Sequence, residues 1–177
     1  LQVPLAVFVW DDGYGISVPT KLQTTKGSVS AALSGFQKKQ GTNGVDIYTI
    51  KGWDYAGMCE IIEHAVQKIR DTHTPALFHV EEITQPQGHS TSGSHERYKS
   101  ADRLTWEKEW DCLKQMREWL IEREIITEAE LVLLEKEDQQ AVEEERKKAW
   151  NAFQSPILAE REKVVGLLDN LAEESSA

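Results

Sequence analysis

Apolar residues in the first hundred positions fall into two alternating patterns, short unbroken runs and longer helical stripes. Between two of the runs, apolar residues from Tyr55 to Ile69 recur at helical spacing, with Asp54 at the N-cap position. A shorter helix is expected at 28–36, with Ser28 as its N-cap. This alternation predicts an α/β fold, a parallel sheet with flanking helices. The runs expected to form strands are 7–10, 45–50 and 74–82.

The run at 7–10 is typical of a central strand buried on both faces, and a polar loop over 17–27 follows it. A chain that begins so close to a central strand, without Met, is expected to lack the N-terminal part of a longer polypeptide. The segment 84–100 is polar and rich in Gly and Ser. Loops of this length in compact domains are usually functional or disordered.

From about residue 101 the apolar spacing becomes helical and stays so. It predicts one helix from Leu104 to Leu120, and a further helix that begins at Thr127 with Glu130 completing a capping box. Pro156 is expected to split the remaining helical sequence. We therefore expect two regions. They are the C-terminal part of an α/β domain at 1–100 and a helical C-terminal region at 101–177.

Charge is spread unevenly along the chain. The sequence has 20 basic and 30 acidic residues, and residues 101–177 hold 11 and 20 of them. This balance argues against a nucleic-acid-binding protein, and no apolar run is long enough for a membrane span. The acidic runs are interpreted as a solvated helical surface, with a partner-binding patch as the alternative. Cys59 and Cys112 are expected to be buried free thiols in a reducing compartment, the cytoplasm or the mitochondrial matrix of a eukaryote.

Two adjacent aspartates, Asp11 and Asp12, follow the first expected strand and precede Gly13. Adjacent carboxylates repel unless a cation or solvent takes up the charge. Two interpretations stay open on these residues alone, a solvated turn and a cation site. The second is attractive because ligands of parallel sheets bind at the carboxyl ends of the strands.

The five histidines differ in the chemistry that they suggest. His64 and His73 are expected on the surface or in structural positions, and His79 is expected to be a hydrogen-bonded core residue. His89 and His95 share the polar loop, where a zinc site would need two further ligands. A loop histidine that bonds a phosphate or a reacting oxygen is favoured. The residues by themselves thus predict a metal–phosphate site built from Asp12 and the 84–100 loop.

Three stretches together resemble a known family. The stretch "WDDGYGIS" resembles the second half of the thiamine-diphosphate motif, in which a strand ends in Asn-Asn followed by x-Tyr-x-Ile-Ser. The stretch "GHSTSGSHERYKS" resembles the active-site loop of alpha subunits of 2-oxo acid dehydrogenases, especially the branched-chain type. The stretch "KGWDYAGMCE" stands where this family has its Gly-x-Asp helix start. The resemblance covers about residues 3–155 and implies part of a thiamine-diphosphate-binding fold.

The resemblance also implies a cofactor site. Asp12 stands at the metal-binding Asn, and Tyr14 would give its backbone carbonyl to the same magnesium ion, which prefers oxygen ligands. Ile16 matches the apolar residue that supports the bent thiamine diphosphate. His89 matches the loop histidine near the diphosphate and the reacting carbon. Gln85 stands where the family often has a phosphate-holding Arg.

Other residues of the loop would act less directly. Ser90 falls beside His89 at the cofactor, and Ser90 and Ser100 match positions that are phosphorylated in mitochondrial relatives. Tyr98 and Lys99 would help to order the loop.

The implied function is oxidative decarboxylation of a 2-oxo acid, branched-chain or pyruvate, with acylation of a lipoyl group. The implied partners are a beta subunit, or a beta half in a fused chain, and the lipoyl domain of the acyltransferase component, in an oligomer. The chain lacks the upstream Gly-Asp-Gly segment that holds the other metal ligand, and the activating glutamate belongs to the beta part. The chain alone is therefore expected to be inactive.

Asp-Asp in place of Asn-Asn adds negative charge beside a diphosphate, and Gln85 removes a positive one. These departures support an alternative. It is a non-catalytic interaction module, made of the α/β and helical regions, that has lost cofactor binding.

Overall fold

The computed structural model describes residues 2–87 and 94–175, and the chain forms two compact units, 1–123 and 124–177. The expected domain boundary at residue 100 stays a prediction. In the first unit the elements that precede and form the sheet are β1 (Ala6–Trp10), β2 (Tyr14–Gly15), β3 (Val18–Pro19), α1 (Thr20–Gln23), η1 (Thr25–Gly27), α2 (Val29–Leu33), η2 (Ser34–Phe36), β4 (Asp46–Lys51), α3 (Tyr55–Thr72) and β5 (Ala76–Glu81). The remaining elements are η3 (His95–Arg97), α4 (Ala101–Glu109) and α5 (Cys112–Glu122), and α6 (Glu128–Ser175) forms the second unit.

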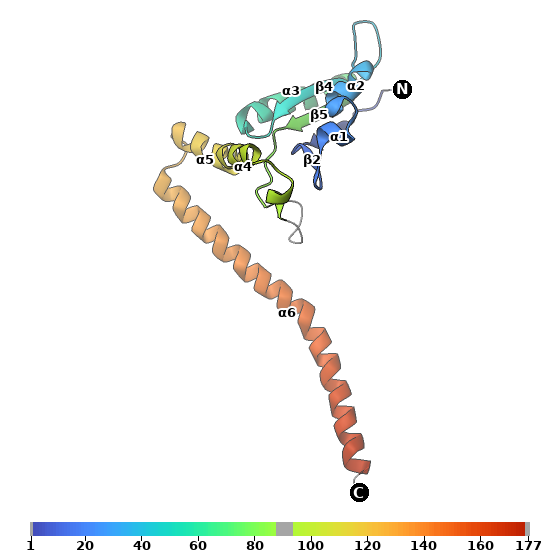
Figure 1. Ribbon diagram of the computed structural model, residues 1–177, viewed down its shortest axis with the longest axis vertical. Helices are drawn as coiled ribbons and strands as arrows, with labels where there is room; N and C mark the ends of the chain where they lie inside the picture. The colour runs from blue at the N-terminus through green and yellow to red at the C-terminus, as the bar shows by residue number, and fades with distance from the viewer. Residues whose placement is uncertain (1, 88–93, 176–177) are drawn as a thin grey trace. The chain divides into compact units, whose positions relative to one another are not determined.

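The described sheet is parallel, with strand order β1-β5-β4 (Figure 1). Ala76 of β5 pairs with Ala6 on one side and with Asp46 on the other, and the register continues to the carboxyl ends of the strands. Ser28 caps α2 by accepting from Ala31 N, and Asp54 caps α3 by accepting from Gly57 N. The parallel α/β fold and both caps are therefore confirmed.

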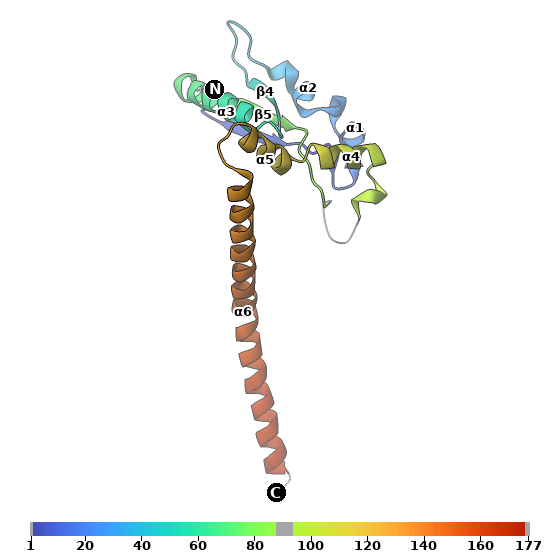
Figure 2. The same ribbon diagram turned by 90° about the vertical axis from the view of Figure 1, so that its left-hand side faces the viewer.

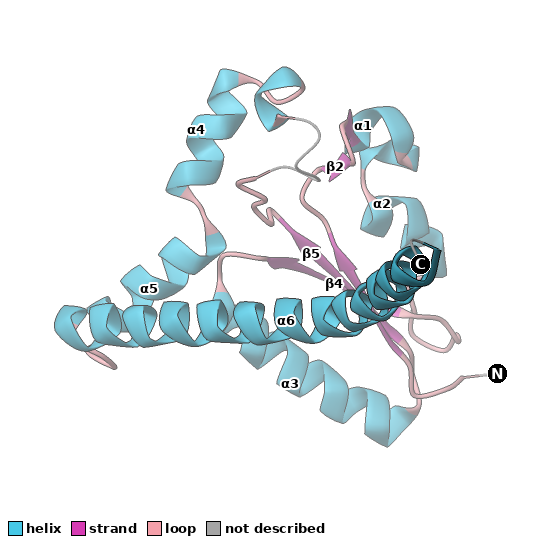
Figure 3. Ribbon diagram, turned by 90° about the horizontal axis from the view of Figure 1, so that it is seen from below, coloured by secondary structure: helices cyan, strands magenta, loops and turns pink. Residues whose placement is uncertain are grey.

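Helices flank the sheet, with α3 along one face (Figure 2). Because side chains alternate across a strand, Ile50, Ala76 and Phe78 all face α3, where they pack with Ala65 and Ile69 as the buried core. The other face bears His79, whose ring bonds Ser30 of α2. Figure 3 shows α1 and α2 apart from α3, with the strands between them.

The prediction that the run 7–10 is a central, doubly buried strand is wrong for the described chain. β1 lies at the edge of the three-stranded sheet, and β5 is the central strand. Trp10 is 60% exposed and Val7 43%. The rings of Phe8 and Phe78 stack with their centroids 4.6 Å apart. The buried core between the sheet and α3, however, is built on β4 and β5, and most of β1 lies outside it.

The expected polar loop at 17–27 contains short regular elements. β2 and β3 form a small antiparallel hairpin, and α1 and η1 follow it. Cys59 is exposed and Cys112 half-buried, so the prediction of buried thiols is wrong, although neither forms a disulfide. In the described part of the chain, no helix is long and apolar enough to cross a membrane.

The helix expected from Leu104 to Leu120 is two helices, α4 and α5. The break follows from Asp111, whose carboxylate caps α5 by accepting from Lys114 N at 3.0 Å. The break is also tied to the sheet, because Thr84 Oγ1 accepts from Cys112 N at 3.2 Å and Trp110 packs on Trp53 with ring centroids 4.7 Å apart.

Helix α6 runs unbroken through Pro156, so the expected split is wrong. A proline removes one helical hydrogen bond and bends a helix, and water can bond the freed carbonyl at an exposed position. Figure 1 shows the bend in α6. The expected capping box at its start is confirmed, with Thr127 N donating to Glu130 at 3.0 Å and Glu130 N donating to Thr127 Oγ1 at 3.3 Å.

Candidate functional site

The carboxyl end of β1 carries the two aspartates, and they have different partners. Asp11 Oδ1 accepts from Gly13 N at 2.7 Å, and Asp11 Oδ2 lies 2.9 Å from His79 Nε2. Since a carboxylate only accepts, Nε2 is the donor. His79 is fully buried, and its Nδ1 lies 2.9 Å from Ser30 Oγ. His79 is thus the hydrogen-bonded core residue that the sequence predicts. The Asp11 carboxylate is the acceptor for its Nε2–H.

Among the described residues, the Asp12 carboxylate bonds only the backbone of its own loop. Its Oδ1 accepts from Tyr14 N at 3.0 Å, which places the carboxylate beside the Tyr14 peptide. Tyr14 pairs in register with Pro19, which has no N–H to donate to the Tyr14 carbonyl. The carboxylate of Asp12 and the backbone carbonyl of Tyr14 therefore belong to the same short loop, two residues apart in the chain.

Ile16 occupies the tip of the β2–β3 hairpin. Its φ of 59° is a left-handed value that a β-branched residue rarely adopts, and its side chain is 66% exposed. Positive φ at the first loop residue is what two-residue hairpins of the primed types require, and glycine is usual there. An apolar, strained residue held in solvent is a feature of binding sites rather than of cores.

A buried ion pair fixes this loop to α4. Lys99 and Glu107 are 5% and 2% exposed, and Lys99 Nζ donates to both carboxylate oxygens at 2.8 Å. Arg103 Nε also donates to Glu107 at 2.8 Å, and its Nη2 donates to the Asp12 carbonyl at 2.7 Å. Both cations lie over the Tyr14 ring, 5.4 and 5.6 Å from its centroid. We call Lys99, Arg103 and Glu107 the α4 latch.

The α4 latch also brings the Arg103 guanidinium to the backbone carbonyl of Asp12. The sequence did not predict that Arg103 and Glu107 hold the Asp12 loop, because in the sequence they look like any other pair of opposite charges on a charged helix. Their spacing of four residues is the only signal that the sequence offers.

A second network lies at the ends of β4 and β5 and was also not predicted. Glu82 accepts from Lys51 Nζ and, at 2.7 Å, from Trp53 Nε1. Burial alone would raise the pKa of Glu82, but these hydrogen bonds outweigh it and hold the pKa below its usual range. Glu82 has a φ of 59°, so the chain turns sharply as it leaves the sheet.

The structure brings together only some of the predicted site residues. The Gln85 carbonyl accepts from Lys99 Nζ at 3.1 Å, which joins the start of the 84–100 loop to the α4 latch. Tyr98 lies edge-on to Tyr14 with centroids 5.7 Å apart. Ser100 caps α4 by accepting from Arg103 N. His89 and Ser90 lie outside the described residues.

The residues present fit half of a magnesium–diphosphate site. The Asp12 carboxylate and the Tyr14 carbonyl are hard oxygen donors of the kind that magnesium takes, and diphosphate oxygens would complete part of the octahedron. Within 2–87 and 94–175, no three His, Cys, Asp or Glu side chains come together as a metal site. The remaining ligands would therefore come from the cofactor and from outside these residues.

Comparison with known proteins agrees with this geometry at the level of the family. The sequence model for "dehydrogenase E1 component" matches residues 1–157. No curated protein matches the chain. The match covers β1, the loop after it that bears Asp12, and the residues of the α4 latch. The chain therefore belongs to the dehydrogenase E1 component family, the thiamine-diphosphate-dependent, decarboxylating components of 2-oxo acid dehydrogenase complexes.

Proposed function

We propose that this chain forms the alpha part of a branched-chain 2-oxo acid dehydrogenase and holds magnesium and the cofactor diphosphate through Asp12 and Tyr14. The observation that carries the proposal is the separation of the two aspartates. His79 engages Asp11, whereas the Asp12 carboxylate accepts only a turn bond from Tyr14 N among the described residues, in a loop that Arg103 fixes. Thiamine diphosphate, when bound, acts as the electron sink for the carbanion left when a 2-oxo acid loses CO2.

In this proposal the protein's own residues orient the metal ligands and bind the cofactor. Arg103 and Lys99 fix the loop that carries Asp12, so the carboxylate and the carbonyl are preorganised before the metal arrives. Ile16, held exposed at the hairpin tip, supports the apolar side of the cofactor. Gln85 and Ser90 complete the diphosphate contacts.

His89 is proposed to act at the reacting atoms. An imidazole titrates near neutral pH, so it can hold or release a proton during transfer of the acyl group to a lipoyl arm. The preference for branched-chain 2-oxo acids over pyruvate rests on the Gly-His-Ser-Thr-Ser stretch alone. A beta subunit or beta half and a lipoyl domain are the proposed partners, and the cytoplasm the proposed location.

The experiment uses the complete component, assembled with its beta part. CO2 release and acylation of a lipoyl domain are measured with branched-chain 2-oxo acids and with pyruvate, and cofactor binding is measured by calorimetry. His89→Ala is expected to reduce lipoyl acylation far more than cofactor binding. Equal loss of both would contradict its role.

The second candidate function, an interaction module without catalysis, is favoured by the Asp-Asp and Gln85 departures. It predicts that the assembled component binds no thiamine diphosphate in the presence of magnesium. Binding without any turnover of the 2-oxo acids would instead overturn the substrate class while keeping the cofactor site.

A further inference from the structure

The second half of α6 carries an exposed apolar stripe that the proposed function does not use. Its side chains are each between 54% and 64% exposed and lie at spacings of three, four, seven, four and three residues. Such spacing, close to 3.5 residues on average, aligns side chains along one face of a helix for contact with another helix. The residues of this stripe are Trp150, Phe153, Ile157, Val164, Leu168 and Leu171.

The spacing of these six residues reads the same in both chain directions. Three other exposed apolar residues of the segment do not share the symmetry, because Leu158, Val165 and Leu167 have Lys163, Pro156 and Gln154 at the mirrored positions. Its centre falls between Glu160 and Arg161, which occupy the gap in the middle. A two-fold axis at that point relates a helix to an antiparallel copy of itself. The axis would set Ile157 against Val164 of the copy, and it would match the outer apolar residues in the same way. Those outer pairs are Phe153 with Leu168 and Trp150 with Leu171.

The charges favour the same arrangement. Across the axis Glu160 of one copy faces Arg161 of the other, and symmetry makes this pair occur twice. Beyond the outermost apolar pair, Trp150 with Leu171, Lys147 of one copy faces Glu174 of the other at each end. A parallel pairing in register would instead set Glu160 against Glu160 and Arg161 against Arg161. Like charges at those positions oppose association.

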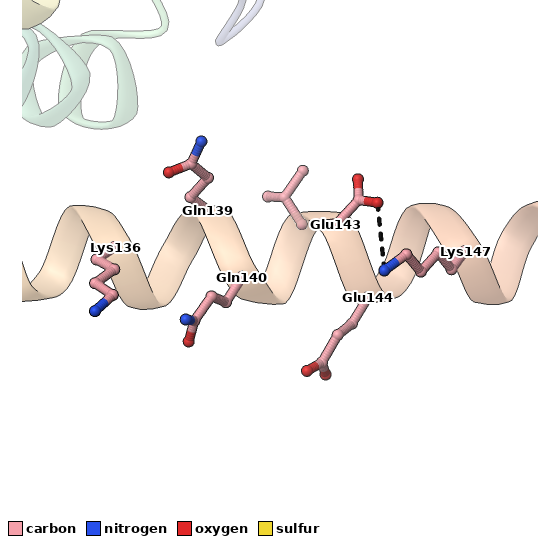
Figure 4. A pocket seen from close by; sticks show the side chains of 7 residues that line it. Lys136, Gln139, Gln140, Glu143, Glu144 and Lys147 are labelled. Atoms are coloured by element: carbon pink, nitrogen blue, oxygen red, sulfur yellow. Dashed lines mark ion pairs between the residues drawn. The ribbon is translucent and has the colours of Figure 1, made fainter.

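The first half of α6 differs in character. Figure 4 shows a shallow hollow there, lined mostly by polar and charged side chains of the one helix. Glu143 is engaged within the helix, by Arg146 at 2.7 Å and Lys147 at 3.5 Å. Surface pairs of this kind suit a solvated helix. The first half also exposes the apolar side chains of Val132, Leu133, Leu134 and Val142, but these are not part of the symmetric spacing. The symmetric stripe spans 150–171, a stretch of about 33 Å at 1.5 Å per residue.

From this symmetry we infer that residues 150–171 of α6 form an antiparallel helix pair with a second copy of this chain. The occupant of the stripe is the same segment of the partner copy, because the six stripe residues and the charged residues beside them match their own mirrored positions under one two-fold axis.

Charge reversal tests the inference on the 177-residue chain. Sedimentation equilibrium is expected to show a dimer. Glu160→Arg and Arg161→Glu each place two like-charged pairs at the axis and are expected to raise the dimer dissociation constant at least tenfold. The double variant Glu160→Arg/Arg161→Glu restores complementarity and is expected to restore dimerisation. Glu162→Arg, the same change on the opposite face, is the control and is expected to leave the constant unchanged.

A disulfide test reads the direction of pairing. In a chain with Cys59→Ser and Cys112→Ser, Ile157→Cys and Val164→Cys are made separately and mixed under oxidising conditions. The antiparallel pair predicts a disulfide between the two different variants and little within either alone. A monomeric chain, or efficient self-linkage of Ile157→Cys, would overturn the inference, and so would failure of the double reversal to restore the dimer.

Discussion

The buried imidazole of His79 donates from Nε2 to the Asp11 carboxylate at 2.9 Å, and this bond gives two adjacent aspartates different tasks. Asp11 ties the end of β1 to His79 of β5, and the other ring nitrogen of His79 lies 2.9 Å from Ser30 Oγ of α2. Within the described part of the chain, the carboxylate of Asp12, one residue later, bonds only the backbone of its own loop. A pair that looks like a doubled charge in the sequence is one structural group and one candidate ligand.

Removal of Asp11 is expected to cost more stability than removal of Asp12. Asp11→Ala leaves the His79 N–H buried without its acceptor, which costs about 1–3 kcal/mol of unfolding free energy. Asp12→Ala loses one local turn bond and is expected to cost at most about 1 kcal/mol. Urea denaturation of the two variants measures both values. Equal losses would mean that the His79 bond does not distinguish the aspartates.

The α4 latch is expected to depend on both of its buried charges. Glu107→Ala leaves Lys99 buried without its counter-ion, and breaking such a pair costs about 3–5 kcal/mol. Replacing both charges, in Lys99→Met/Glu107→Leu, is expected to recover most of that loss, because no fully buried charge is left unpaired. Arg103 also loses Glu107, but it is partly exposed and keeps its bond to the Asp12 carbonyl. Denaturant unfolding of the single and double variants is the measurement. A double variant as unstable as Glu107→Ala would refute the explanation.

How much of this could be foreseen differs from one element to another. The caps of α2, α3 and α6 were predictable, because Ser28, Asp54 and Thr127 act on residues three positions away. The three strands were predictable from their runs of β-branched and aromatic residues. The pairing of Asp11 with His79 was not, since 68 residues separate them and only the fold brings them together.

The errors share a physical cause, because each depends on contacts or exposure that the local sequence does not specify. Periodicity continues across Trp110, but a side-chain cap at Asp111 and the contact of Trp110 with Trp53 end α4 there. Pro156 reads as a break, yet an exposed helix can accommodate it. The run 7–10 has the composition of a buried strand, and its burial depends on neighbours that its own residues do not specify.

The strained backbone of Ile16 gives a prediction with two opposite effects. Ile16→Gly removes the cost of a left-handed β-branched residue and is expected to raise the unfolding free energy by about 1 kcal/mol. The same change removes the exposed side chain and is expected to weaken cofactor binding to the complete component. Thermal unfolding and calorimetry give the two values. Stabilisation without weaker binding would remove Ile16 from the proposed site.

On α6, the pair between Arg146 and Glu143 lowers the pKa of Glu143 to about 2. Because the folded value lies below the ordinary 4.5, the helix gains from this pair above about pH 4.5 and loses it as the pH falls toward 2. Carbon-13 NMR titration of the Glu143 carboxyl measures its midpoint. Arg146→Gln is expected to move that midpoint up toward 4.5, and an unchanged midpoint would contradict the assignment.

The most direct test of the central claim is calorimetric titration of the complete component with thiamine diphosphate in the presence of magnesium. The natural protein is expected to bind, Asp12→Ala is expected to lose most of the affinity, and Asp102→Ala, an exposed carboxylate in the first turn of α4, is expected to bind normally. Magnesium-dependent binding that survives Asp12→Ala unchanged would contradict the claim that Asp12 holds the metal.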